Sequence, residues 1–256
     1  MRKTPSTRKT PRIRPTDIRT TVDNQKRLGR RLLWLLSLPF CLTGILVWMY
    51  YNLSQRLADV ELGAKLVTIE RYLVADQNYP WAIDQYEKIA KTNPSGPILA
   101  RLGMLHFLLD RKNESIALQK LDMARRADPD NWEVYRNLTY IYLKIDRKKE
   151  AIEAGQRALE LNSNDANTYN NLAWIHATSD DPALRNLSRA QDYAEKAVKL
   201  TREKQSDFLD TLAEVYFRKG DRDGALASFK KAGAASLGDT PKIQTRFKEL
   251  FPTEVM

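Results

Sequence analysis

The chain has almost none of the residues from which catalytic and metal centres are built. Its 256 residues include one cysteine and two histidines. A single cysteine, Cys41, excludes an intrachain disulfide and a cysteine-based zinc cluster. His106 and His176 do not have the H-E-x-x-H spacing of a zinc hydrolase, and neither a glycine-rich phosphate loop nor a G-x-S-x-G motif occurs. The sequence therefore predicts a protein that is not an enzyme and that uses no cofactor or metal.

Acidic residues are nearly absent from the N-terminal end. Residues 1–31 contain eleven lysines and arginines but only Asp17 and Asp23, which gives this segment a charge of +9 and leaves +1 for the rest of the chain. A nearly neutral remainder argues against a nucleic-acid partner. The tail also contains Thr, Pro and Ser, so we expect residues 1–31 to be disordered and to touch anionic lipid headgroups. Docking of a cytoplasmic partner, docking of nucleic acid, and mitochondrial targeting are the alternatives.

Charge is also missing from the segment between Leu32 and Tyr51, which has twenty residues. A helix of that length is about 30 Å long, which matches the hydrocarbon core of a bilayer. Trp34 and Trp48 lie towards its two ends, as interfacial anchors do. We therefore expect one transmembrane helix that contacts the lipid bilayer through Leu32 to Tyr51. A buried helix of a soluble domain and a cleaved signal peptide are the alternatives.

The basic residues precede this apolar segment. The positive-inside rule then places the N-terminus in the cytoplasm and the rest of the chain on the other side, which is the periplasm in a Gram-negative bacterium. We expect a single-pass protein of the inner or plasma membrane, with the mitochondrial inner membrane as the alternative. The predicted segments are a tail (1–31), a transmembrane helix (32–51), a juxtamembrane helical linker (52–62), a repeat domain (63–238) and a capping helix (239–256).

A pattern of paired helices repeats about every 34 residues from Gly63 onward. Its clearest copy starts at Trp132, and Leu138 is followed by Leu172 one period later. Small residues recur on the second helix of each pair, at Ala158 in this copy. With five copies in register, the chain resembles the tetratricopeptide repeat (TPR) family over about 170 residues. The resemblance implies an all-α, TPR-type solenoid of about five helix pairs with a C-terminal capping helix.

Three copies depart from the pattern. In the first copy Glu70 stands where the family carries a small residue, and the turn of the second copy is two residues longer than usual. In the fourth copy five extra residues fall between Ser179 and Arg189, which predicts a longer loop. After the last copy, Pro241 begins a short segment with an apolar face, which we interpret as a helix that covers the last repeat.

In TPR proteins the first helix of each pair lines the concave face, where partner segments bind. Carried onto this sequence, the resemblance implies a partner-binding groove with Asn137 and Asn171 at equivalent positions. Such asparagines bind an extended peptide backbone in some family members, although they can also be solvated polar residues. Tyr140, Trp174 and Phe217 are candidate apolar anchors or ordinary packing residues. The full set of candidates is Arg101, Met104, Arg136, Asn137, Tyr140, Lys144, Asn170, Asn171, Trp174, Asp210, Glu214 and Phe217.

These features together predict a membrane-tethered module that binds and positions partner proteins, as an assembly or scaffolding factor for an envelope or membrane complex. Two other functions remain open at this point. The chain could be a permanent structural subunit of a larger membrane complex, or a regulator that acts through its basic tail. The sequence does not identify the partner.

Overall fold

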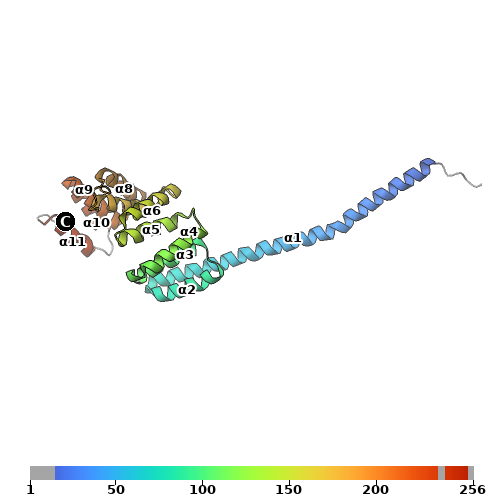
Figure 1. Cartoon of the computed structure of the whole chain (residues 1–256), viewed down its shortest axis with the longest axis horizontal. Helices are drawn as coiled ribbons and strands as arrows, with labels where there is room; N and C mark the ends of the chain where they lie inside the picture. Colours follow the sequence, from blue (N-terminus) through green and yellow to red (C-terminus); the bar gives the residue numbers. More distant parts are fainter. Residues whose placement is uncertain (1–14, 236–239, 253–256) are drawn as a thin grey trace, which may run out of the picture. The chain divides into compact units, whose positions relative to one another are not determined.

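The computed structural model describes the backbone of residues 15–235 and 240–252, and the side chains of residues 46–235 and 243–252. Within these ranges the chain consists of eleven α-helices and one short 3-10 helix, with no β-strand (Figure 1). The all-α prediction is therefore confirmed for the described residues. The chain forms two compact units, Met1–Thr68 and Ile69–Met256.

The first unit is dominated by the helix α1 (Pro15–Asp76), which has 62 residues and continues into the second unit. Its start differs from the prediction, because residues 15–31 are helical rather than disordered. Proline is favoured in the first turn of a helix, where its missing N–H needs no partner, and Pro15 occupies that position here.

The predicted membrane helix is described only in part. The side chains of residues 32–45 and the tail segment 1–14 lie outside the described residues. In the part that the structure does describe, no helix is both long and apolar enough to span a bilayer. The anchor at Leu32 to Tyr51 therefore stays a prediction.

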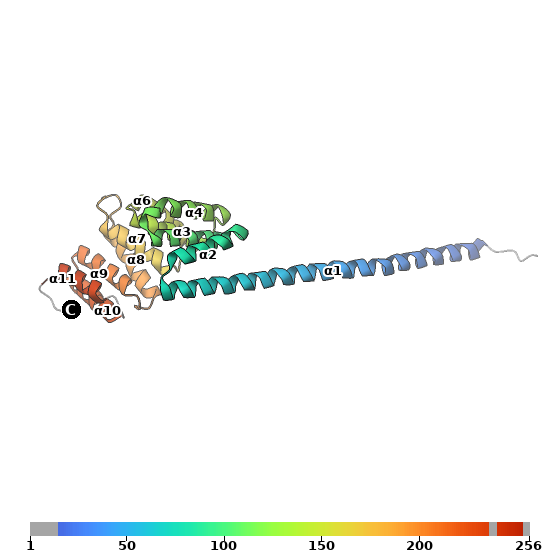
Figure 2. The same ribbon diagram turned by 90° about the horizontal axis from the view of Figure 1, so that it is seen from below.

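The second unit is a row of helix pairs joined by short turns. The last two turns of α1, from Ile69, contact α2 (Tyr79–Thr92) through the rings of Tyr72 and Trp81, whose centroids are 5.5 Å apart. The further pairs are α3 (Gly96–Leu109) with α4 (Glu114–Ala127), α5 (Trp132–Lys144) with α6 (Lys148–Leu161), α7 (Ala166–Thr178) with α8 (Leu187–Leu200), and α9 (Ser206–Lys219) with α10 (Arg222–Ala235). Each pair packs against the next, so the pairs form a solenoid (Figure 2).

Small residues allow the helices to approach closely. A Cβ atom at Gly103 would lie 2.9 Å from the carbonyl oxygen of Ala117 on α4, and one at Gly155 would lie 2.8 Å from Leu172 on α7. Ala173 and Ala213 are fully buried at the corresponding places of later pairs. The small residues of the repeat pattern thus lie at points of close helix contact.

Both predicted irregular turns have local structure. The longer turn of the second pair contains the 3-10 helix η1 (Arg111–Asn113). The loop after α7 is held by His176, whose Nδ1 lies 2.7 Å from the carbonyl oxygen of Leu184, and by Arg185, whose Nε donates to Ser179 O over 2.8 Å. Burial lowers the pKa of His176, because it disfavours the charged imidazole. His176 is therefore a packing residue that also fixes a loop.

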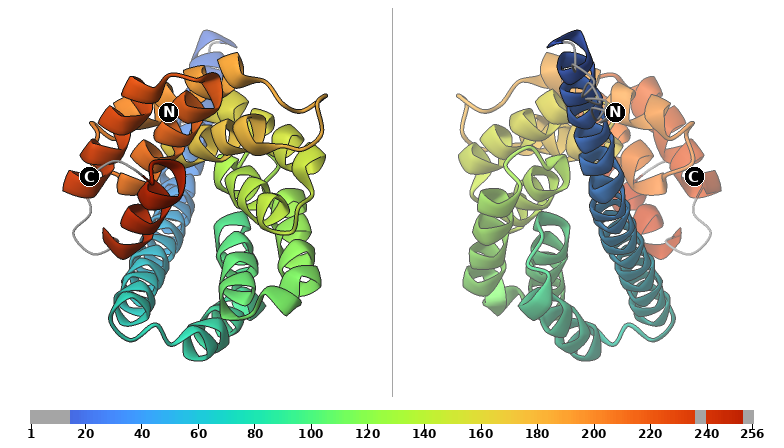
Figure 3. Two further views of the ribbon diagram at one scale, coloured as in Figure 1. Left: turned by 90° about the vertical axis from the view of Figure 1, so that its left-hand side faces the viewer. Right: turned by 90° about the vertical axis from the view of Figure 1, so that its right-hand side faces the viewer.

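The helix α11 (Thr240–Leu250) packs against α10 and covers the apolar face of the last pair. Ile243, Phe247 and Phe251 are each at most 1% exposed. The rings of Phe247 and Phe251 lie 5.9 Å from that of Phe229 on α10. Figure 3 shows the pairs of the second unit following a curved path, with α11 in the darkest red.

Candidate functional site

The first helices of successive pairs line one groove, which we call the inner groove. It has a volume of about 920 Å³, and α3, α5, α7, α9 and α11 contribute its walls. Ten of the twelve candidates from the sequence line it: Arg101, Met104, Arg136, Asn137, Tyr140, Lys144, Asn170, Asn171, Trp174 and Asp210. These residues lie on α3, α5, α7 and α9, which follow one another in the sequence at intervals of about one repeat. The stacking of the repeats brings the four helices side by side, so their residues share one groove.

The two remaining candidates lie elsewhere on α9. Glu214 is 5% exposed and binds arginines, while Phe217 packs edge-on against Phe251 with ring centroids 5.5 Å apart. Neither contributes to the lining of the groove. The reason is the C-terminal segment, because Arg246 of α11 binds Glu214 and Phe251, just beyond α11, packs on Phe217, which stays 37% exposed. Sequence reasoning placed this segment at the end of the solenoid without placing its side chains.

Amides and aromatic rings make up the middle of the groove. Asn137 is 8% exposed, and Oδ1 of Asn170 is buried without a hydrogen-bond partner among the described residues. A buried amide oxygen without a partner carries a desolvation cost that a ligand N–H could relieve. Tyr140 and Trp174 present partly exposed rings to the same groove. The wall can therefore hydrogen-bond a peptide backbone and also bury an apolar side chain.

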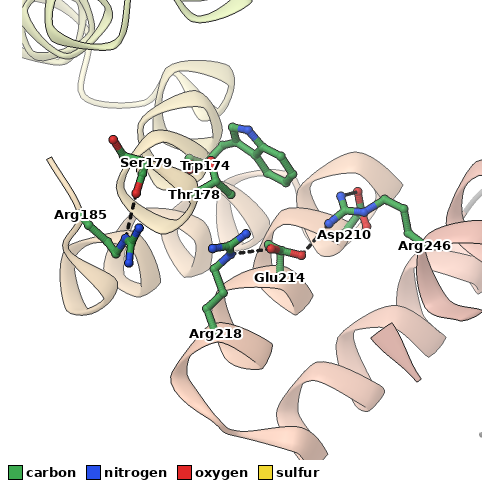
Figure 4. A network of polar contacts seen from close by, with 8 residues as sticks. All are labelled: Trp174, Thr178, Ser179, Arg185, Asp210, Glu214, Arg218 and Arg246. Carbon is green, nitrogen blue, oxygen red and sulfur yellow. Dashed lines mark hydrogen bonds and ion pairs between the residues drawn. The ribbon is translucent and has the colours of Figure 1, made fainter. Parts of the chain in front are cut away.

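A network of ion pairs closes one end of the groove. Arg246 of α11 donates from Nη1 to Asp210 and from Nη2 to Glu214 over 2.7 Å, and its guanidinium lies 5.1 Å from the centroid of the Trp174 ring. Nε of Arg218 donates to the other oxygen of Glu214 over 2.6 Å. In Figure 4 the two arginines approach Glu214 from opposite sides. Asp210 and Glu214, both at most 5% exposed, are thus neutralised where they are buried.

A second network lies at the start of the solenoid. Arg101 donates from Nε to Oε1 of Glu70 over 2.7 Å and from Nη2 to Oε2, which is a bidentate pair. The hydroxyl of Tyr86 donates to the same carboxylate over 2.6 Å. Burial and this hydrogen bond raise the pKa of Tyr86. Glu70, which replaces the small residue of the repeat pattern, therefore joins the first pair to α3.

The charge of the groove differs from the pattern in the sequence. The sequence has arginines early and carboxylates late along the lining, which suggests a change of sign. In the structure Arg101 is paired with Glu70, and Asp210 and Glu214 are paired with Arg246. Arg136 lies 3.7 Å from Glu133 and stacks over Trp132 at 4.8 Å. The expected gradient is therefore cancelled by partners from other helices for Arg101, Asp210 and Glu214, and by residues of its own helix α5 for Arg136.

Sequence reasoning missed four residues of these networks, which are Glu70, Tyr86, Arg218 and Arg246. Arg246 was grouped with the capping helix, because its distance in the chain from Trp174 gives no sign that the two meet. Glu70 was read as a departure from the pattern at a terminal repeat. Its signal was the acidic residue itself, which needs a cationic partner once it is placed at a helix-packing position.

Comparison with known proteins agrees with the repeat pattern. A tetratricopeptide repeat model matches residues 133–165, which is the copy with the clearest pattern. The chain is similar to a thermophilic TPR protein of Thermus thermophilus, with 21% identity, a TM-score of 0.59, and coverage of 74% of this chain and 98% of that chain. It is also similar to pilF of Pseudomonas aeruginosa, with 17% identity, a TM-score of 0.60, and coverage of 77% and 94%.

A third similar structure is that of MamA, with 24% identity, a TM-score of 0.50, and coverage of 74% of this chain and 94% of that one. No curated protein sequence matches this chain. At these identities the structural likeness shows the fold alone. The fold of the described repeats is that of a TPR-like α-solenoid, an architecture whose extended concave surface mediates protein–protein interaction.

Proposed function

We propose that the chain is a membrane-tethered module that holds a segment of a partner protein in its inner groove. The observation that carries this proposal is the groove wall itself, where the amides of Asn137, Asn170 and Asn171 alternate with the rings of Tyr140 and Trp174. Such a wall satisfies the backbone of an extended segment and anchors a large side chain, as interface hot spots do. The partner class is therefore a protein segment that contains an aromatic or aliphatic residue.

The membrane part of the proposal rests on the uncharged segment Leu32 to Tyr51 and the charge of +9 that precedes it. Tethering confines the groove to a thin layer next to the bilayer, which raises its effective concentration towards partners in the same membrane. This arrangement suits an assembly or scaffolding factor for a membrane or envelope complex. The repeats would lie on the non-cytoplasmic side.

Photo-crosslinking tests the groove. A photoreactive amino acid is placed at Tyr140 or Trp174 in the full-length protein in its own membrane, and at Gln156 on the exposed side of α6 as the matched control. We expect the same partner to be captured from both groove positions and not from Gln156. Equal capture from all three positions, or capture from Gln156 alone, would show that another face binds.

A second experiment separates binding from folding. Replacing Asn171 and Trp174 by alanine should reduce partner recovery at least tenfold, with the thermal unfolding curve shifted by only a few degrees. The pair Gln156→Ala and Lys149→Ala on the outer, exposed side is the control. Recovery of the partner at the wild-type level from the groove variant contradicts the proposal.

Topology is tested separately. A reporter fused after Met256 should be active only if it lies on the non-cytoplasmic side of the membrane. Absence of reporter activity from a full-length fusion contradicts the proposed topology, and recovery of the full-length protein in the soluble fraction without detergent contradicts the tethering. Either result leaves the groove proposal intact.

A further inference from the structure

The first unit exposes an apolar stripe along α1. Its members are seven residues that share one side of the helix and that no other described part of the chain covers, and the first two, Leu46 and Tyr50, belong to the end of the proposed membrane segment. Their side chains are far more exposed than those of the solenoid core, at 63% for Leu46, 75% for Tyr50, 58% for Leu53, 61% for Leu57, 70% for Val60 and 69% for Val67, and Ala64 is exposed as well. We call these seven residues the α1 stripe. A row of this size on a helix surface marks a face that another molecule covers.

The spacing of the α1 stripe indicates that the molecule covering it is another helix. Successive members are alternately four and three residues apart, so the same position returns every seven residues. A repeat of 3.5 residues per turn keeps apolar residues in contact only with another helix that supercoils around the first. In that register Leu46, Leu53, Val60 and Val67 occupy d positions, and Tyr50, Leu57 and Ala64 occupy a positions.

The residues between the stripe positions argue against lipid as the cover for the part beyond Tyr51. Arg56, Asp59, Glu61 and Lys65 fall within two turns of Leu57 and Val60, and Glu61 forms an exposed ion pair with Lys65 over 2.8 Å. Four charged residues in ten positions are incompatible with the hydrocarbon core of a membrane. They are compatible with the flanks of a coiled coil in water.

Two of these charges also fix the identity and direction of the partner helix. With the stripe at a and d, Arg56 occupies a g position and Glu61 the e position of the next heptad. In a parallel pair of identical helices, each g residue lies beside the e residue of the following heptad on the other helix. Arg56 of one copy then faces Glu61 of the other, twice by symmetry. An antiparallel pair does not bring g and e residues together in this way.

We propose that the α1 stripe is a self-association surface, which pairs in parallel with the α1 stripe of a second copy of this chain. Three heptads are short for an independent coiled coil, because helices of this length are only marginally stable alone. Here the helix is preformed as part of α1, which removes most of that cost. The inference does not depend on what the inner groove binds.

Disulfide crosslinking of the full-length protein tests the pairing. Cys41→Ser removes the natural thiol, and single cysteines are then introduced at the stripe positions Leu53 or Val60. Gln55 and Ala58, which are exposed on other sides of the same helix, are the matched controls. After mild oxidation in the native membrane, we expect at least tenfold more disulfide-linked dimer from the stripe positions than from the controls. Equal yields at all four positions, or no dimer from Val60→Cys, would overturn the proposal.

Charge exchange tests the direction and the identity of the partner. In the Leu53→Cys background, Arg56→Glu and Glu61→Arg each place like charges opposite one another, and each should lower the dimer yield about fivefold. The double variant restores opposite charges only in a parallel homotypic pair, so it should return the yield to within twofold of the unmodified level. Dimer yields that are unchanged in both single variants, or a dimer yield that remains low in the double variant, would overturn the parallel pairing.

Discussion

Removing the guanidinium of Arg246 should destabilise the end of the solenoid strongly. This side chain is 20% exposed and bridges two carboxylates that are almost fully buried, Asp210 at 4% and Glu214 at 5%. In Arg246→Ala the carboxylates stay in place while their shared cation is lost. Glu214 keeps Arg218, with its Nε at 2.6 Å, so this carboxylate retains one cationic partner.

The size of the effect follows from the burial of both carboxylates and from the arginine that Glu214 retains. Breaking a buried ion pair by removing one partner costs about 3–5 kcal/mol, and partial exposure together with the remaining Arg218 places this case near the lower end, at about 3 kcal/mol. Loss of the contact between Arg246 and the Trp174 ring lies within that figure. For a domain of this size each kcal/mol lowers the melting temperature by about 2–4 °C, so we expect a decrease of roughly 6–12 °C.

Thermal unfolding of the full-length protein in detergent, followed by far-ultraviolet circular dichroism, measures this decrease. Lys231→Ala is the matched control, because it breaks an ion pair with Glu203 of similar length, 2.9 Å, whose partners are more than half exposed. We expect that control to cost less than about 1 kcal/mol. A shift of less than about 2 °C for Arg246→Ala would refute the reasoning, since the two buried carboxylates would then not depend on α11.

Three further changes have expected outcomes. Burial lowers the pKa of His176, so the unfolded chain binds a proton near pH 6.5 whereas the folded chain binds it only at lower pH. Stability should therefore fall as the pH drops below 6.5, and His176→Asn should flatten this dependence in melting curves from pH 5 to 8. Gly103→Ala should cost about 1–3 kcal/mol in chemical denaturation, because its Cβ would meet α4 at 2.9 Å, whereas Gly63→Ala, with nothing within 4 Å, should be neutral or stabilising. Glu70→Ala should speed amide hydrogen exchange in α2 several-fold without affecting α7 to α10, because it frees Arg101 and the Tyr86 hydroxyl; unchanged exchange in α2 would contradict the assigned link.

The repeat spacing predicted most of the fold. Leu138 and Leu172 lie one period apart because each fills the same place in successive pairs, and that period determined which helices line the inner groove. The pattern is local, so it could not show which side chains of α11 return to the groove. Arg246 meets Trp174 across 72 positions of sequence, and only the curvature of the stacked pairs brings them together. The same applies to Phe217, whose partner Phe251 comes from beyond the last repeat.

The start of α1 was missed for a different reason. The charge of residues 1–31 predicts a segment that cannot form a hydrophobic core, and this says little about whether it is helical. A helix needs no core of its own when it continues from one that is already formed, since extending a helix costs far less than starting one. Pro15 then marks the start, in the one helical turn where proline is favoured.

In the proposed capture of a partner segment by the inner groove, the contacts of Arg246 also affect how fast and how selectively the segment is bound. Two carboxylates and one indole ring hold this side chain, so its rotamers are fixed before any partner arrives. Ordering a free arginine at an interface costs about 0.5–1.5 kcal/mol, and at this end of the groove that ordering is complete when the chain folds. The same guanidinium lies 5.1 Å from the centroid of the Trp174 ring. A partner segment would therefore meet a rigid wall here. The conformational entropy that the segment itself loses then becomes the main entropic difference between ligands of high and low affinity.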